Sequence, residues 1–138
     1  MDREKTIFEK IIDGEIPATK VYEDDKVLAF LDIAPVNIGH TLVIPKKHSR
    51  NIFDTDDETL AHIAKVVKKV TTAVRGAVKA DGINIIQNNE PVAGQIVFHS
   101  HVHIVPRFVG DGFRHWHGNR EYTEGEAIEI GEKIKQNL

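Results

Sequence analysis

The hydrophobic positions of the chain follow two repeats, one typical of helices and one typical of strands. Between residues 55 and 82, apolar side chains recur every three or four positions, which predicts one long helix with a single buried stripe. The run Thr55-Asp56-Asp57-Glu58 predicts its beginning as a capping box, and Asp81-Gly82 predicts its end. The predicted stripe consists of Leu60, Ile63, Ala64, Val67, Val70, Val74 and Val78.

Two shorter helices are predicted towards the two ends of the chain. The run Thr6-Ile7-Phe8-Glu9 fits a capping box, and an apolar stripe follows it as far as Gly14. The run Thr123-Glu124-Gly125-Glu126 resembles another capping box and predicts a C-terminal helix. The side chains of this last helix that we expect to point inward are Ala127, Ile130 and Ile134.

Five segments are rich in branched apolar residues and are bounded by proline, glycine or aspartate, so we expect them to be strands. They are residues 20–23, 27–32, 40–44, 83–87 and 98–106. The prolines Pro45 and Pro106 are expected to end two of them. Hairpin and short-loop connections favour an antiparallel sheet with helices packed on it, an α+β fold. Residues 1–138 are expected to form a single domain, since there is no internal repeat or low-complexity segment.

The composition narrows the class of protein. The chain has 138 residues, a formal net charge of −3 and no cysteine. The negative charge argues against a broad nucleic-acid-binding surface. The missing cysteines exclude disulfides, thiolate metal sites and a cysteine nucleophile. The charged N-terminus and the lack of an apolar run of about 20 residues predict a cytoplasmic protein without a signal peptide or membrane segment.

Three of the eight histidines lie within five residues, in the run His99-Ser100-His101-Val102-His103. On a strand these rings share one face, with neighbours roughly 6.6 Å apart along the strand. One reacting atom cannot contact both outer rings across about 13 Å. We therefore predict that His101 is the reacting group and that the outer two orient it or hold substrate oxygens. A purely structural triad is disfavoured, because buried rings need hydrogen-bond partners and protonated rings repel one another. Chelation of zinc is an alternative.

The run from His99 to Val105, preceded by Gly94-Gln95, resembles the signature of the histidine triad (HIT) nucleotide hydrolases and transferases. Ser100 departs from that signature at a position expected on the face opposite the triad. The resemblance covers nearly the whole chain. It implies a five-stranded antiparallel sheet in each subunit and a homodimer with the sheet continuous across the interface.

The resemblance also implies a catalytic site. His101 would attack the α-phosphorus of a purine nucleotide and form a nucleotidyl-histidine intermediate. The backbone near His99 would fix the tautomer of His101, and His103 would stabilise the developing charge. His40 matches a fourth histidine of the family, on a neighbouring strand.

Further positions match the nucleotide pocket of the family. Asp32 would accept hydrogen bonds from the two ribose hydroxyls, and an apolar slot would hold the base. The slot consists of Phe8, Ile11, Ile33 and Leu42, and the positions next to the phosphate and the leaving group are Asn88, Gly94, Gln95, Ile96 and His103.

Two departures from the family bear on the chemistry. One branch of the family has a serine where this chain has Ile96, and that serine helps to protonate an amine leaving group. Many bacterial relatives have a Cys-x-x-Cys pair for structural zinc, where this chain has Thr6 and Glu9. His48 and His99 match the other two zinc ligands, but two histidines without thiolates make a poor zinc site. We therefore expect no metal and no cofactor.

The leading hypothesis is a hydrolase of purine nucleoside 5'-phosphoramidates. It would cleave the bond between the α-phosphorus of an adenylate or guanylate and an amine. Hydrolysis of dinucleoside polyphosphates and nucleotidyl transfer are nearby alternatives. A third possibility is a nucleotide-binding interaction module with incidental activity. The fourth is a zinc protein that uses the triad as ligands.

Overall fold

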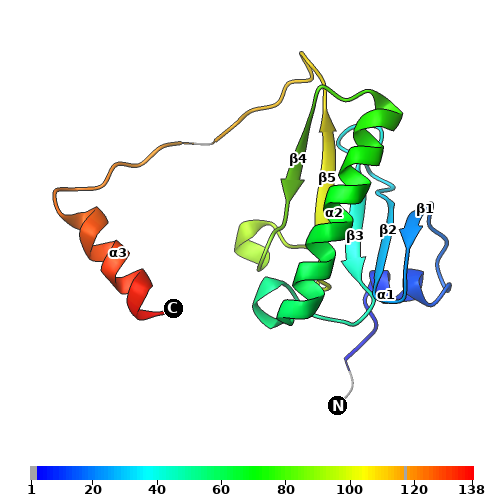
Figure 1. Cartoon of the computed structure of the whole chain (residues 1–138), viewed down its shortest axis with the longest axis horizontal. Helices are drawn as coiled ribbons and strands as arrows, with labels where there is room; N and C mark the ends of the chain where they lie inside the picture. Colours follow the sequence, from blue (N-terminus) through cyan, green and yellow to red (C-terminus); the bar gives the residue numbers. More distant parts are fainter. Residues whose placement is uncertain (1–2, 117) are drawn as a thin grey trace.

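The computed structural model describes residues 3–116 and 118–138, and it contains a five-stranded antiparallel sheet with three α-helices (Figure 1). The sheet has the strand order β1-β2-β3-β5-β4. This is the α+β arrangement that the sequence predicts. The elements are α1 (Ile7–Ile12), β1 (Lys20–Glu23), β2 (Val27–Leu31), β3 (Thr41–Pro45), α2 (Asp57–Val78), β4 (Gly82–Ile86), β5 (Val102–Arg107) and α3 (Glu126–Gln136), with single 3₁₀ turns at Ile52–Asp54 and Pro91–Ala93.

The central strands serve two cores, because successive side chains of a strand point to opposite faces of the sheet. One face packs on α2 and the other packs on α1. The core under α2 contains Val27, Ala29, Val43, Ile63, Val66, Val70, Val74, Val102 and Ile104. The core under α1 contains Phe8, Ile11, Leu28, Phe30, Leu42 and Ile44. The histidines of the triad alternate with Val102 and Ile104, so the sheet register directs them away from α2.

The long helix differs from its prediction at its N-terminal end. Its N-cap is Asp56, whose carboxylate accepts a hydrogen bond from the backbone N–H of Thr59. Thr55 is buried instead, and its hydroxyl donates to the carbonyl of Asn51 at 2.6 Å. Two of the predicted stripe residues, Leu60 and Ala64, lie outside the core.

Of the two prolines expected to end strands, Pro45 is the last residue of β3, whereas Pro106 is followed by Arg107 within β5. Pro106 is part of β5, where it pairs with Ile83 of β4. The pairing of β5 with β3 extends only from Val102 to Ile104, so at Pro106 the second side of β5 has no strand beside it. The carbonyl of Pro106 accepts from the side chain of Asn37 on that side, where the missing proline N–H costs no ladder hydrogen bond.

The expectation that α3 packs inward is wrong. None of its residues is buried, and the side chain of Ile134 is 58% exposed. Its N-cap is Gly125, in the left-handed conformation, rather than Thr123. Figure 1 shows why: an extended segment leaves β5 on the side of β4 and carries α3 away from the sheet. No described helix has the length and apolarity that crossing a bilayer requires.

Gly39 supplies a test of how tightly β3 is held against α2. It has φ +102°, and a Cβ at this position would lie 2.9 Å from Cγ1 of Val78. We predict that Gly39→Ala lowers the free energy of unfolding by roughly 2 kcal/mol more than Gly14→Ala, because it adds overpacking to backbone strain. Gly14 has φ +79° with open space around it, so it isolates the backbone cost. Urea unfolding of both variants gives the comparison, and equal losses would contradict the packing argument.

Candidate active site

The triad lies at the beginning of β5, and only His103 is part of the strand. His99 and His101 lie in the segment before it, although the sequence predicts all three on the strand. Their rings still lie in one row on the α1 side of the sheet. The ring of Phe8 is 5.8 Å from His99 and 5.0 Å from His101 between centroids, and His101 is 5.0 Å from His103. The alternation of side chains therefore continues past the end of the strand.

The ring of His101 has a fixed tautomer. Its Nδ1 lies 2.7 Å from the carbonyl oxygen of His99, which can only accept, so Nδ1 carries the proton. Nε2 is then the nitrogen with the lone pair. Burial lowers the pKa of His101, because loss of hydration penalises the charged ring. The ring is therefore neutral near pH 7, with a nucleophilic nitrogen available.

A second chain of hydrogen bonds fixes His40 and His103. The backbone N–H of Val36 donates to Nδ1 of His40 at 3.1 Å, so the proton of His40 lies on Nε2. That Nε2 donates to Nδ1 of His103 at 2.9 Å, which leaves the proton of His103 on its own Nε2. Burial lowers the pKa of both rings, that of His103 to about 4. His103 thus presents an N–H donor beside the lone pair of His101.

His99 has both ring nitrogens engaged and is fully buried. Its Nε2 donates to the carbonyl of Pro45 at 2.7 Å, and its Nδ1 accepts from the hydroxyl of Thr6 at 3.2 Å. Burial lowers its pKa to about 4. These bonds hold the backbone carbonyl that orients His101, so His99 positions the site rather than contacting a reacting atom.

The resemblance placed Thr6 near His99 only as a position of the family's zinc site, and the sequence analysis did not predict the hydrogen bond between them. Thr6 is the N-cap of α1, and its hydroxyl oxygen accepts from the backbone N–H of Glu9 at 3.1 Å. The hydroxyl hydrogen remains available, and it is donated to His99. The capping box was visible in the sequence, but the partner of the hydroxyl is 93 positions away.

Three of the four residues expected to form the apolar slot lie together, and Ile33 does not. Phe8, Ile11 and Leu42 are buried in the core under α1, and Leu42 pairs directly with His103 across the sheet. Ile33 is 92% exposed, because it follows β2 in a loop where the alternation of the strand has ended. Asp32 lies closer to the site, with Oδ2 3.6 Å from Nε2 of His40, and its carboxylate is partly exposed.

The loop before the triad is anchored by Gln95, which the resemblance places next to the phosphate or the leaving group. Its buried amide donates to the carbonyls of Arg50 and Val97 and accepts from Asn51 and from the backbone of Glu90. The side chain is therefore committed to holding the loop.

Glu90, a second anchor of this loop, was not predicted from the sequence. It adopts φ 78° and ψ 153°, a conformation that is almost confined to glycine. Two hydrogen bonds from the guanidinium of Arg50, at 2.8 and 3.0 Å, hold its carboxylate.

The other predicted positions of this loop lie on its surface. Gly94 follows the 3₁₀ turn with φ 97°, and the side-chain amide of Asn88 lies 3.4 Å from the place of a Cβ on Gly94. Ile96 is 86% exposed and outside any strand. Asn88, Gly94 and Ile96 can therefore border a ligand without rearrangement of the core.

Glu9, His48 and His99 lie where the resemblance implies structural zinc, with one ligand atom of each within 4.8 Å of the others. Their present bonding does not fit a metal ion. Glu9 pairs with Arg3, which lowers the pKa of its carboxyl to about 2, and Nε2 of His48 bonds to the carbonyl of Phe98. Both nitrogens of His99 are engaged as well. A zinc ion would have to break this network and would gain no thiolate.

Asp32, His40 and His103 form a second such group, with one ligand atom of each within 4.8 Å of the others. A metal there would replace the hydrogen bond between the two rings that sets the tautomer of His103. The donor set of one carboxylate and two imidazoles can hold a metal in principle. The tautomer chain, in contrast, already satisfies every nitrogen of His40.

Comparison with known proteins agrees with this geometry. Residues 13–110 match the family model described as HIT domain. The adenosine 5'-monophosphoramidase hnt1 of Schizosaccharomyces pombe is 41% identical over 134 residues, which are 94% of this chain and 98% of that protein. A HIT family crystal structure from Bacillus subtilis is 43% identical over 98% of both chains, with a TM-score of 0.92.

A zinc-bound histidine triad family protein from Mycobacterium smegmatis has a lower structural similarity. It is 37% identical over 96% of both chains, with a TM-score of 0.75. The family model, the relatives of nearly full length and the row of histidine rings lead to one conclusion. The chain belongs to the histidine triad (HIT) family.

Proposed function

We propose that this protein hydrolyses purine nucleoside 5'-phosphoramidates through a nucleotidyl-His101 intermediate. The observation that supports the proposal most is the pair of fixed neutral rings at the triad. His101 offers a lone pair on Nε2, and His103 offers an N–H donor beside it. Attack on a phosphate ester or amide needs a nucleophile and a hydrogen-bond donor at the developing charge. The name of the fission yeast relative supports the same chemistry.

The reaction has two displacements. In the first, Nε2 of His101 forms a bond to the α-phosphorus and the phosphorus–nitrogen bond of the amine breaks. The departing amine takes up a proton from solvent water, which regains one when water attacks in the second step, and the N–H of His103 donates to a non-bridging oxygen of the phosphate. In the second, water attacks phosphorus, loses a proton and displaces His101, which regains its neutral state. The product is the nucleoside monophosphate.

The substrate pocket in this proposal is the surface around the triad. The partly exposed carboxylate of Asp32 accepts from the two ribose hydroxyls, which is how a carboxylate commonly recognises a vicinal diol. Leu42 and Phe8 border the histidine row and supply apolar surface for the base. Asn88, Gly94 and Ile96 line the side where the leaving group departs.

The exposed Ile96 favours a second candidate class of substrate. Its side chain cannot donate a proton, and an amine leaves phosphorus poorly unless it is protonated. A dinucleoside polyphosphate or another nucleotidyl ester has an acidic leaving group that needs less help. The same two displacements at His101 serve these substrates.

We also propose that the protein acts as a cytoplasmic homodimer, as the family resemblance implies. The strand β4 is an edge of the sheet, and its residues Ile85 and Ile86 are exposed. A shallow groove of about 350 Å³ lies beside it, with Leu60 and Ala64 in its lining. Pairing of β4 with a second copy would extend the sheet and cover these apolar side chains.

The substitution His101→Ala tests the proposed function. We expect kcat/KM on an adenylate–amine conjugate to fall at least about 100-fold, because covalent catalysis through this nitrogen is lost. Nucleotide affinity should stay within a few-fold, measured by calorimetry with AMP. The control His62→Ala changes a histidine of α2 that pairs with Asp24, and it should keep its activity. A wild type with tight AMP binding and negligible turnover would instead indicate an interaction module.

The pH dependence of kcat/KM is a separate prediction. Burial lowers the pKa of His101, His103 and His40, so these rings take up a proton only at a pH below the ordinary histidine value of about 6.5. The neutral forms are the active ones, so the rate should stay constant as the pH falls through 6.5 and decline only below it. Activity profiles between pH 4 and 8 measure this, and an acid limb centred at or above pH 6.5 would contradict it.

The side chain of Ile96 should determine how strongly the enzyme depends on its leaving group. General-acid assistance is typically worth about 10²–10⁴-fold, so its absence should slow basic amines most. We predict that Ile96→Ser flattens the dependence of kcat/KM on amine basicity across a graded series of adenylate amides. Val92→Ser is the matched control, since Val92 is an exposed residue of the same loop. Parallel dependences for all three proteins would show that the proton comes from another group.

A further inference from the structure

The C-terminal segment, which consists of the described residues after Arg107, packs little against the rest of its own chain. After β5 the chain turns at residues 108–111, and the described residues from there to α3 form no helix or strand, with Phe113, Trp116 and Tyr122 exposed. The segment ends in α3, which has no buried residue. An isolated helix of 11 residues is marginal in water, so α3 needs a packing partner.

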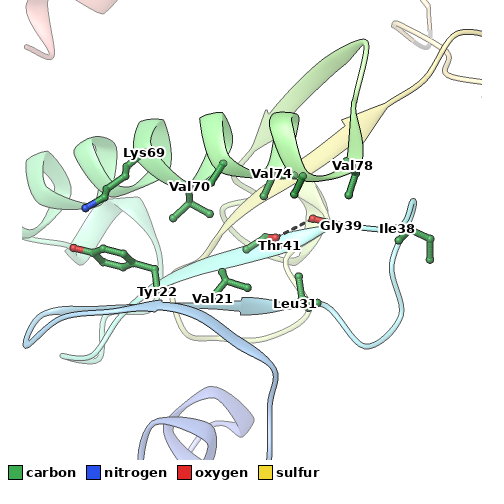
Figure 2. A pocket seen from close by; sticks show the side chains of 12 residues that line it. Val21, Tyr22, Leu31, Ile38, Gly39, Thr41, Lys69, Val70, Val74 and Val78 are labelled. Carbon is green, nitrogen blue, oxygen red and sulfur yellow. Dashed lines mark hydrogen bonds between the residues drawn. The ribbon is translucent and has the colours of Figure 1, made fainter.

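An apolar groove lies elsewhere on the molecule. It has a volume of about 470 Å³ and runs between α2 and the strands β1, β2 and β3 (Figure 2). Apolar side chains line it on both sides, and Ile38 at its rim is 77% exposed. Soluble proteins rarely leave an apolar surface of this kind uncovered. The lining includes Val21, Leu31, Ile38, Ala73, Ala77 and Lys69.

The α3 of the same chain is poorly placed to cover this groove. Figure 1 shows the C-terminal segment leaving the sheet on the side of β4, whereas β1 and β2 lie at the opposite side. The course of the segment is nevertheless reproduced in a solved relative. The B. subtilis structure aligns over 98% of this chain at a TM-score of 0.92, so the alignment includes α3. A helix that is undocked within its own chain yet held in one place indicates a support outside that chain.

The surface of α3 complements the groove in shape. Ala127, Ile130, Gly131 and Ile134 recur at helical spacing and form one apolar face. Two of these residues are small, and so are Ala73 and Ala77 on the groove wall of α2. Small residues on both sides let two helices approach closely, and the two isoleucines then fill the space towards the strands.

The charges of the two surfaces are complementary as well. Lys69 lies at the rim of the groove, where its ammonium contacts the ring of Tyr22. It takes part in none of the ion pairs found among the described residues. The first turn of α3 has Glu126 and Glu129. An acidic helix end beside a lysine is a favourable pairing at a contact edge.

We propose that α3 of one copy docks in the groove between α2 and the strands of a second copy. A two-fold related pair makes this contact twice, because each chain supplies one helix and one groove. The exchanged helices would then cover apolar surface that neither chain covers alone. The contact does not involve the histidine row, so the experiments on it test it independently of the proposed hydrolysis.

Single-cysteine variants test the contact directly, because the native chain has no cysteine. Chains with Ala73→Cys in the groove are mixed with chains with Ile134→Cys on the apolar face of α3, and a short bismaleimide is added. We expect a cross-linked heterodimer, identified by a size tag on one of the two chains. The matched controls are Thr72→Cys, on the outer side of α2, and Glu132→Cys, on the outer side of α3. They should cross-link at least tenfold less.

A chain with one cysteine cannot cross-link to itself, so these products report only contacts between copies. If α3 folds back onto its own groove, the mixtures give no heterodimer. The double variant Ala73→Cys with Ile134→Cys would then form an internal link at high dilution, and the proposal would be overturned. Equal yields from the control positions would overturn it as well.

Charge substitutions on α3 give an independent measurement that leaves the core unchanged. We expect Ile130→Glu to raise the dimer dissociation constant at least tenfold in sedimentation experiments, because it places a carboxylate in the apolar groove. Ile128→Glu makes the same change on a different face of α3, where the side chain is exposed, and it should have little effect. The same dissociation constant for both variants would show that this face of α3 does not hold the copies together.

Discussion

Burial of neutral histidine rings is the constraint on which the site depends. Removing water from an imidazole penalises its charged form, so the pKa of His40, His99, His101 and His103 all fall. A neutral imidazole has one N–H donor and one nitrogen acceptor, and a buried ring needs a hydrogen-bond partner for each of them. The carbonyls of Pro45 and His99 and the N–H of Val36 decide which nitrogen keeps its proton. A nucleophile and a donor side by side are the result.

This dependence extends beyond the sheet to α1. Thr6 begins the helix and also donates to His99, so the N-terminus of α1 and the triad share one hydrogen bond. Glu9 closes the capping box and is held by Arg3. In this chain hydrogen bonds and an ion pair make the connection, which ties its strength to the packing of α1.

The sheet and the C-terminal segment, in contrast, leave apolar side chains and a strand edge without partners in the described chain. An exposed edge at β4, an apolar groove beside α2 and an undocked α3 are each unfavourable for a lone chain. The proposed exchange of helices between two copies would cover the last two together, and the proposed pairing of β4 would cover the first. The histidine rings are packed within one chain on the α1 side of the sheet, and the groove beside α2 lies on the other side.

The sequence by itself determined the parts of this protein that depend on local periodicity. The stripe around Val70 and Val74 predicted α2, and the spacing of the histidines predicted a shared face with His101 at its centre. These patterns hold because helices and strands have fixed repeats. Where two elements meet, local pattern was insufficient: the stripe did not show that Leu60 faces the β4 edge, or that a helix with Ile134 would remain exposed.

Only the tertiary structure decided the contacts between distant parts of the chain. The hydroxyl of Thr6 bonds to His99, and the side-chain amide of Gln95 bonds to the backbone of Arg50 and Val97. Glu90 takes a conformation suited to glycine, and its carboxylate bonds to the guanidinium of Arg50. Such choices depend on which polar partner lies within about 3 Å after folding. Residue type and spacing do not determine that distance. The face on which a side chain lies, in contrast, follows from the repeat of the helix or strand alone.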